Sequence, residues 1–142
     1  MVNEKEREIL NLPFVGVASF AKYPIHLDLD PLEADGAVFG MPYDMSTQWR
    51  PGTKLGPRGI RDSSCLYSLG HQGSDDPERD EVYLHPEGVK VVAVGDVDQV
   101  HADMEQCFDN IDKFVRKLTE KDVLPVGLGG DHAVTIPFAQ AL

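Results

Sequence analysis

The sequence predicts an α/β protein with a mainly parallel sheet. Three apolar segments of strand length alternate with segments whose apolar residues recur at helical spacing. This alternation is typical of parallel strands joined by right-handed crossovers. Functional residues in such sheets gather just beyond the carboxyl ends of the strands. Three segments are therefore candidates for a site, namely 42–56, 95–100 and 129–132.

The N-terminal half begins with weak signals and then gives one clear strand and one helix. Residues 1–12 suggest a short helix or a tail, and residues 13–34 are loop-rich. The continuous apolar segment GAVFGMP, 36–42, predicts the first strand. The long polar loop YDMSTQWRPGTKL follows. A helix then begins at Gly56-Pro57 and ends near Leu69, because proline favours the first helical turn.

The second half repeats the strand–helix pattern. After an acidic, turn-rich segment at 71–88, VKVVAVGD suits a central parallel strand that is covered on both faces. An amphipathic helix spans about 103–121, with Asp103 as its N-cap. The strand VLPVGL, 123–128, is followed by a helix that begins near Val134.

Length and composition suit one soluble domain. The 142 residues can form a single core, and the net charge of −11 argues against a nucleic-acid or anionic-membrane surface. An acidic chain attracts a metal or a cationic substrate, although many soluble proteins are simply acidic. Cys65 and Cys107 are too few for a disulfide framework and predict buried thiols. The charged N-terminus and the lack of a membrane-length apolar segment predict a soluble protein of a reducing compartment.

The segment GLGGDH carries the strongest candidate for chemistry. Gly129 and Gly130 let the backbone turn sharply after a strand. His132 then becomes a candidate metal ligand, with Asp131 as an acceptor for the other imidazole N–H or as an anchor behind the ligand. A histidine at this position also fits an ordinary loop residue, and the local pattern leaves both interpretations open.

Other polar residues favour structural roles. Asp96 and Asp98 could hold a divalent cation, but a turn cap and a solvated carboxylate explain them better. Arg61 either pairs across the structure or binds an anion. Neither a strained serine elbow nor a glycine-rich phosphate loop occurs in the sequence.

Taken together, three segments resemble the ureohydrolase family of arginases, agmatinases and guanidino-acid hydrolases. They are GMPYDMSTQWRPGTKLGPRGIRDSS, VVAVGDVD and LPVGLGGDHAVTIP, and the first is similar to the agmatinase branch. The resemblance implies a three-layer α/β/α sandwich and hydrolysis of a guanidino C–N bond with release of urea. It also implies a small guanidino substrate, a trimer or hexamer of the full-length protein, and a cytoplasmic or mitochondrial role in polyamine or nitrogen metabolism.

The resemblance further implies residue roles. The family holds two Mn²⁺ ions, or Ni²⁺ in some members, which activate the attacking hydroxide. His132 matches a metal ligand of the GGDH motif, and Gly129, Gly130 and Asp131 match the rest of that motif. Trp49 and Arg50 match the loop beside the substrate entrance, and Asp96 matches a structural position.

The sequence departs from the family in one respect. The motifs D-A-H-x-D and D-x-D-x-x-D-P, which carry the other metal ligands, do not occur in residues 1–142. We therefore expect the chain to form an incomplete, N-terminal portion of a single ureohydrolase domain, without a second domain. One histidine cannot hold two divalent ions, so the chain alone is predicted to be inactive.

Two alternatives to a guanidino hydrolase remain at this point. The chain could be a catalytically dead relative that acts as an assembly or regulatory partner. It could also be an unrelated metal- or nucleotide-binding module. The sequence does not choose among agmatine, guanidinobutyrate, guanidinopropionate and guanidine as substrates, since all present the same guanidinium group.

Overall fold

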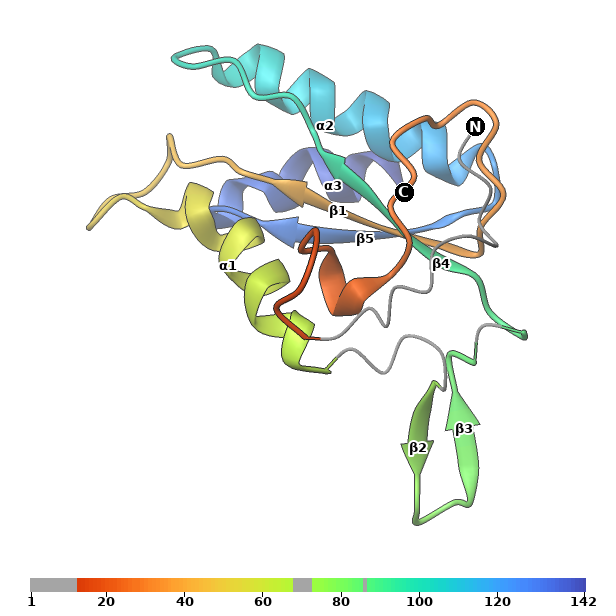
Figure 1. Ribbon diagram of the computed structural model, residues 1–142. Helices are drawn as coiled ribbons and strands as arrows, with labels where there is room; N and C mark the ends of the chain where they lie inside the picture. Colours follow the sequence, from red (N-terminus) through yellow and green to blue (C-terminus); the bar gives the residue numbers. More distant parts are fainter. Residues whose placement is uncertain (1–12, 68–72, 86) are drawn as a thin grey trace.

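A computed structural model describes residues 13–67, 73–85 and 87–142. The predicted helix or tail at 1–12 lies outside the described residues. The main sheet contains β1 (Gly36–Met41), β4 (Val91–Asp96) and β5 (Leu124–Gly129), all parallel, in the order β4-β1-β5 (Figure 1). The predicted parallel sheet is confirmed.

The central strand is β1, and not the strand at 89–96 as the sequence suggested. All six residues of β1 are buried, whereas β4 lies at one edge of the three-stranded sheet. The apolar composition of β4 reflects its buried face, because Val92 and Val94 belong to the hydrophobic core. An isolated parallel bridge between Ile25 and Ala93, together with the segment around it, covers the outer side of β4.

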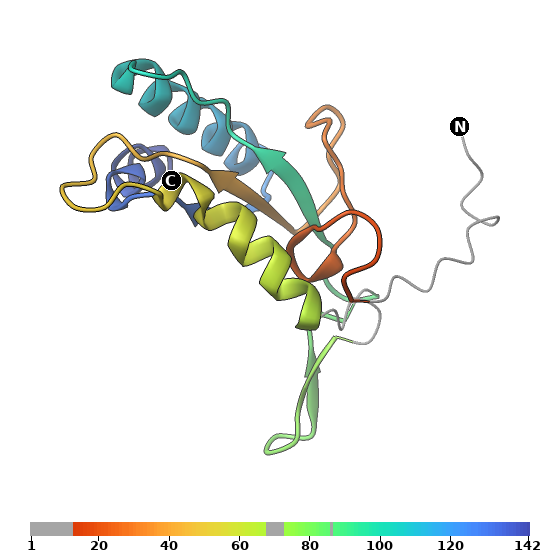
Figure 2. The ribbon, with the colours of Figure 1, turned by 60° about the vertical axis from the view of Figure 1, so that its left-hand side comes forward.

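Helices cover both faces of the sheet and give three layers (Figures 1 and 2). The helices α2 (Met104–Thr119) and α3 (Thr135–Ala141) lie on one face, and α1 (Gly56–Ser64) lies on the other. Side chains of β1 alternate between these layers, since Phe39 packs against Phe114 of α2 with ring centroids 4.9 Å apart, while Gly40 faces Pro57 of α1.

The longest helix follows the predicted pattern closely. The Asp103 carboxylate accepts a hydrogen bond from Gln106 N at 3.0 Å, which confirms the predicted N-cap of α2. Cys107, Ile111, Val115 and Leu118 recur at helical spacing and are fully buried against the sheet. Burial of each such aliphatic side chain contributes roughly 1.5–3 kcal/mol, so this face of α2 anchors the core.

Two elements differ from the sequence-based expectation. The helix α1 ends at Ser64 and continues as a short 3₁₀ turn at Cys65–Tyr67. Residues that were predicted only as turns contain a hairpin of β2 (Ser74–Asp76) and β3 (Glu81–Tyr83), which projects away from the sheet (Figures 1 and 2). Strands this short and acidic carry no apolar alternation, so periodicity cannot reveal them.

The two cysteines agree with the prediction of buried thiols. Cys65 and Cys107 are buried free thiols. Within the described ranges, every helix is too short or too polar to cross a membrane.

Candidate functional site

The carboxyl ends of all three main strands meet, as the sequence predicted. Backbone N–H groups beyond β5 donate to the end of β1, with Gly130 N 2.9 Å from Met41 O and Asp131 N 2.9 Å from Tyr43 O. On the other side, Val97 N donates to Gly40 O at 2.9 Å. The three candidate segments therefore share one edge of the sheet.

Gly130 permits the closest of these contacts. A Cβ atom at this position would lie 2.0 Å from Tyr43 O and 2.6 Å from Tyr43 N, which are backbone atoms with little freedom to move. Gly129 is less constrained, because its Cβ would meet Val134 Cγ2 at an ordinary 3.5 Å. The double glycine thus contains one position where the packing excludes any side chain.

Asp131 links the end of β5 to the loop after β1. The residue is 8% exposed, and its Oδ2 accepts a hydrogen bond from Ser46 N at 2.8 Å. Its Oδ1 accepts from Ala133 N at 2.9 Å and caps the 3₁₀ turn His132–Val134. Backbone N–H groups therefore engage both carboxylate oxygens, and Asp131 fixes the backbone on either side of the strand end.

His132 begins that 3₁₀ turn and is exposed. It borders a cavity of about 310 Å³ whose wall also includes Met41, Gly130 and Phe138. Within the described residues, no three His, Cys, Asp or Glu side chains lie close enough to hold a metal ion. The described residues therefore form no metal centre by themselves, and the ligand role of His132 stays a prediction.

The loop between β1 and α1 is organised by Asp44. Its Oδ1 accepts hydrogen bonds from the hydroxyls of Thr53 at 2.6 Å and Thr47 at 2.8 Å, and its Oδ2 accepts from Gly52 N at 2.6 Å. The Thr53 hydroxyl is the largest of the causes that lower the pKa of Asp44. This carboxylate holds a turn in which Arg50 has φ 54° and Gly52 has φ 144°.

The predicted entrance residues lie in this loop. Trp49 is 79% exposed, and Arg50 is also exposed. Their role beside a substrate entrance stays a prediction. The sequence reasoning missed Asp44 and Ser46, although an aspartate followed by serine, threonine, proline and glycine is typical of a side chain that organises its own loop.

Asp96 has a structural role, although it pairs with Arg61 and is not the turn cap that the sequence favoured. It forms a bidentate ion pair with Arg61, whose Nη1 and Nη2 atoms lie 2.5 Å and 3.0 Å from Asp96 Oδ1 and Oδ2. This pairing raises the pKa of Arg61. The contact needs Gly40, because a Cβ there would lie 2.0 Å from Asp96 Oδ1. Of the two interpretations of Arg61, the structure therefore supports pairing across the fold.

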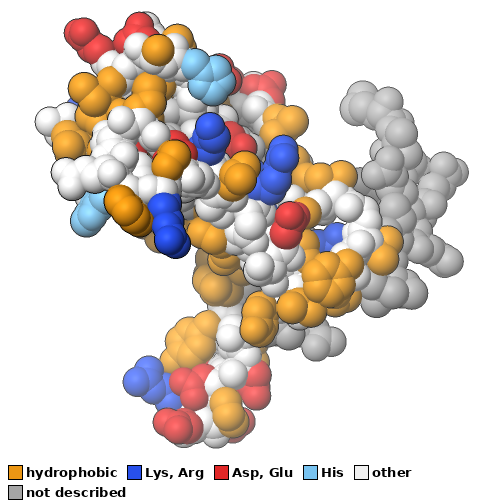
Figure 3. Space-filling view, turned by 90° about the vertical axis from the view of Figure 1, so that its left-hand side faces the viewer, with side chains coloured by type: hydrophobic (Ala, Val, Ile, Leu, Met, Phe, Trp, Pro, Cys, Tyr) orange, Lys and Arg blue, Asp and Glu red, His pale blue; other side chains and the backbone are white. Residues whose placement is uncertain are grey.

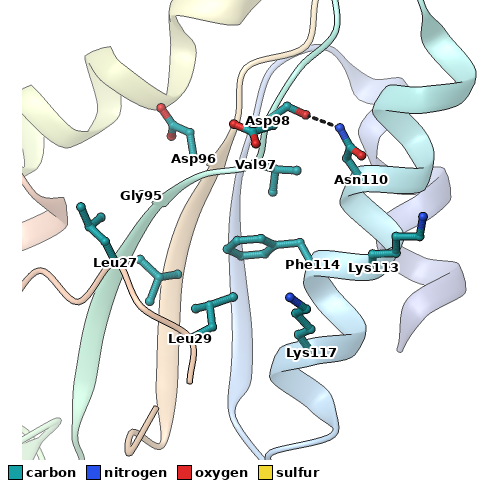
Figure 4. A pocket seen from close by; sticks show the side chains of 11 residues that line it. Leu27, Leu29, Gly95, Asp96, Val97, Asp98, Asn110, Lys113, Phe114 and Lys117 are labelled. Atoms are coloured by element: carbon teal, nitrogen blue, oxygen red, sulfur yellow. Dashed lines mark hydrogen bonds between the residues drawn. The ribbon is translucent and has the colours of Figure 1, made fainter. Parts of the chain in front are cut away.

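A second cavity lies beside the end of β4 (Figure 4). It has a volume of about 430 Å³ and lies between the strand end and α2, with Phe114 across its floor. The backbone O of Asp98 accepts a hydrogen bond from Asn110 Nδ2 at 3.0 Å, and Asp98 itself is exposed. Asp96 is therefore occupied by Arg61, and the exposed Asp98 agrees with the solvated carboxylate that the sequence favoured.

Most of this chain is similar in sequence to known proteins. Residues 34–142 match the model of the arginase family. The chain is 30% identical over 128 residues to the mitochondrial guanidino acid hydrolase of Homo sapiens, which covers 90% of this chain and 34% of that protein. It is 33% identical over 112 residues to the agmatinase of Bacillus cereus, which covers 78% of this chain and 35% of that enzyme.

The fold has close counterparts among solved structures. Proclavaminate amidino hydrolase from Streptomyces clavuligerus superposes with a TM-score of 0.75 at 28% identity, covering 91% of this chain and 40% of that one. The chain therefore spans about a third to two fifths of the length of the proteins it matches.

Proposed function

The chain belongs to the arginase family, and we propose that it forms one wall of a site that hydrolyses a guanidino C–N bond and releases urea. The relatives named above as guanidino acid hydrolase and agmatinase support this class of reaction. Agmatine is the substrate we favour, because the loop after β1 carries the agmatinase-like motif.

The observation that carries the proposal is the way Asp131 fixes the strand end. Its two backbone partners are Ser46 in the loop after β1 and Ala133, which directly follows His132. A ligand must be held in place before the metal arrives, and Asp131 supplies that restraint without itself facing a metal. His132 is left exposed at the carboxyl edge, where its imidazole can bind one divalent ion.

The loop that Asp44 organises provides the substrate-facing part of this wall. The exposed indole of Trp49 offers an aromatic face to a guanidinium cation, which is a favourable arrangement. Arg50, next to it, suits an anionic group on a substrate tail or a partner. Both assignments rest on the position of the residues in the loop and on the family resemblance.

The metal centre of the proposed enzyme needs further ligands. We expect two Mn²⁺ ions, with Ni²⁺ as the alternative, and the described residues form no group of three possible ligands. The other ligands would therefore come from polypeptide beyond the described residues. In the assembled site the metals would activate water, while this chain would position one ligand and contact the guanidinium group.

Complementation tests the proposal directly. The chain is co-expressed with the C-terminal portion of the Bacillus cereus agmatinase, and urea release from agmatine is measured with Mn²⁺ present. We expect release by the pair, none by the chain alone, loss in His132→Ala and retention in His101→Ala, which alters another exposed histidine. Release that is unchanged in His132→Ala would refute the ligand assignment.

An assembly or regulatory role is the second candidate. It needs no metal centre within the described residues. The same co-expression distinguishes the two functions, because an assembly partner would copurify with the agmatinase portion or with an intact agmatinase and add no His132-dependent urea release.

A further inference from the structure

The hairpin of β2 and β3 stands apart from the rest of the fold. We call residues 74–84 the arm. Figures 1 and 2 both show it extending away from the sheet and from all three long helices. Nearly every residue of the arm is exposed, and Asp76 is the one half-buried exception. Because an isolated two-stranded hairpin is at best marginally stable in water, the arm is expected to gain stability from a surface that packs on it.

The composition of the arm indicates what kind of surface that is. It contains five acidic residues, namely Asp75, Asp76, Glu78, Asp80 and Glu81. Its one cation, Arg79, is used internally, with Nε 3.9 Å from Asp76 Oδ2 and Nη1 3.3 Å from the Tyr83 hydroxyl. Beside the acids, three apolar side chains are exposed, Val82 at 52%, Tyr83 at 41% and Leu84 at 47%. A matching surface would be cationic and partly apolar.

One part of this chain has that character. We call residues 49–58 the cationic segment. It carries Arg50, Lys54 and Arg58, all exposed, and no acidic residue. Its apolar members Trp49 and Leu55 are 79% and 61% exposed. In a chain of net charge −11 this segment is an exception, and it pairs the same two properties as the arm with the opposite sign of charge.

The arm and the cationic segment of one molecule do not meet. In Figures 1 and 2 they lie at different ends of the fold, with α1 running between them. Figure 3 shows acidic, apolar and Lys or Arg groups together on the projecting arm, and further Lys or Arg groups on the body above it. Contact between the two therefore requires a second molecule.

We propose that the arm docks on the cationic segment of a second copy of this chain. A two-fold arrangement lets each arm reach the partner's segment, so both complementary contacts form and the assembly closes. The inference needs neither a metal nor a substrate, but its surface shares Trp49 and Arg50 with the proposed substrate-facing loop, so its tests alter Lys54 and Arg58 instead. Docking would also place acidic side chains of one copy beside Trp49 and Arg50 of the other.

Charge and apolar contact have separate tasks in this interface. Each exposed ion pair contributes little, roughly 0.2–1 kcal/mol, so the charges chiefly set the orientation and the association rate. Burial of the exposed apolar residues on both sides supplies the larger part of the affinity. The association should therefore weaken with salt without disappearing.

Sedimentation of the full 142-residue chain tests the proposal. We expect a monomer–dimer equilibrium whose dissociation constant rises when NaCl is increased from about 0.05 M to about 0.5 M, which shortens the screening length several-fold. The variants Asp75→Lys/Glu78→Lys and Lys54→Glu/Arg58→Glu should each weaken dimerisation by roughly tenfold or more. A monomer at concentrations on the order of 100 μM would overturn the proposal.

Mixing the two variants is the decisive step. A reversed arm then meets a reversed segment in one contact, and a native arm meets a native segment in the other, so the heterodimer should recover most of the wild-type affinity. The double variant Glu33→Lys/Glu120→Lys is the matched control, because it makes the same charge change at exposed sites outside both surfaces. Equal weakening by this control, or no recovery on mixing, would refute the specific contact. Circular dichroism of each variant confirms that the fold is retained.

Discussion

A glycine–aspartate pair lies at the carboxyl end of two strands, and the two carboxylates have different partners. Asp96, the last residue of β4, meets the guanidinium of Arg61 in α1. After β5, Asp131 meets the backbone N–H groups of Ser46 and Ala133. The Asp96 side chain is 40% exposed in its ion pair, whereas Asp131 as a residue is 8% exposed.

The difference separates a structural contact, at the end of β4, from a candidate site, at the end of β5. An ion pair between side chains joins two elements, and each charged group is already occupied by the other. A carboxylate bound to backbone N–H groups instead fixes the course of the chain, and the residue beside it remains available. His132 is that residue, and the two strand ends can be tested against one another.

The largest effect is expected from the glycines that make room at each strand end. Gly130→Ala should lower the free energy of unfolding by at least about 3 kcal/mol, because its Cβ would overlap the Tyr43 backbone. Gly40→Ala should cost less, since much of its overlap is with the movable Asp96 side chain. Gly129→Ala is the mild control. Urea denaturation gives all three values, and an equal cost for Gly129 and Gly130 would contradict the packing argument.

The next effect concerns Asp131 itself. Asp131→Ala removes two charge-assisted hydrogen bonds at a buried position and should cost roughly 2–4 kcal/mol. Asp131→Asn keeps one acceptor oxygen and should cost about half as much. Hydrogen exchange of the Ser46 amide provides a local measurement, and its protection should fall in both variants. Unchanged protection would show that other contacts hold the loop.

The Arg61–Asp96 ion pair at the end of β4 should contribute less to the free energy of unfolding than the Asp131 contacts. Arg61 and Asp96 have side chains that are 18% and 40% exposed, so solvent screens their attraction. A double-mutant cycle with Arg61→Gln and Asp96→Asn should give a coupling of roughly 0.5–1 kcal/mol. A coupling above that of the Asp131 contacts would reverse the comparison between the two strand ends.

Sequence predicted the strand ends well because their signals are local. The apolar segments fixed where β1, β4 and β5 lie, and GGDH marked the end of β5. The order of the strands depends on long-range pairing, which explains why β4 was placed at the centre in error. The Arg61–Asp96 pair joins residues 35 positions apart, so the sequence left two interpretations of Arg61 open.

The loop after β1 shows a different limit. Asp44 gathers Thr47, Gly52 and Thr53 through contacts within ten residues, and such contacts follow from turn chemistry once the aspartate is considered. The bond from Ser46 to Asp131 crosses 85 residues and has no local signal. The metal-ligand role of His132 still rests on family resemblance and on position.

The hydrogen bonds that Asp44 accepts in the loop after β1 should depend on pH. Its pKa is lowered in the folded chain, so the contribution of its hydrogen bonds is fully present above the unfolded pKa of about 4 and is lost as the pH falls through the lower folded value. The Gly52 amide resonance should therefore shift below pH ~4, and Asp44→Asn should remove that transition. A transition above the unfolded value would mean that the sign of the shift is wrong.

The smallest effect on stability is expected at the residue with the greatest proposed importance. His132 is exposed, so His132→Ala should change the free energy of unfolding by less than about 0.5 kcal/mol. A loss comparable to that of Asp131→Ala would make the histidine a packing residue and weaken its assignment as a ligand. A small change in the free energy of unfolding, together with loss of urea release in the complemented enzyme, would assign different roles to the two neighbours. Asp131 would stabilise the strand end, and His132 would act as the ligand that this strand end presents.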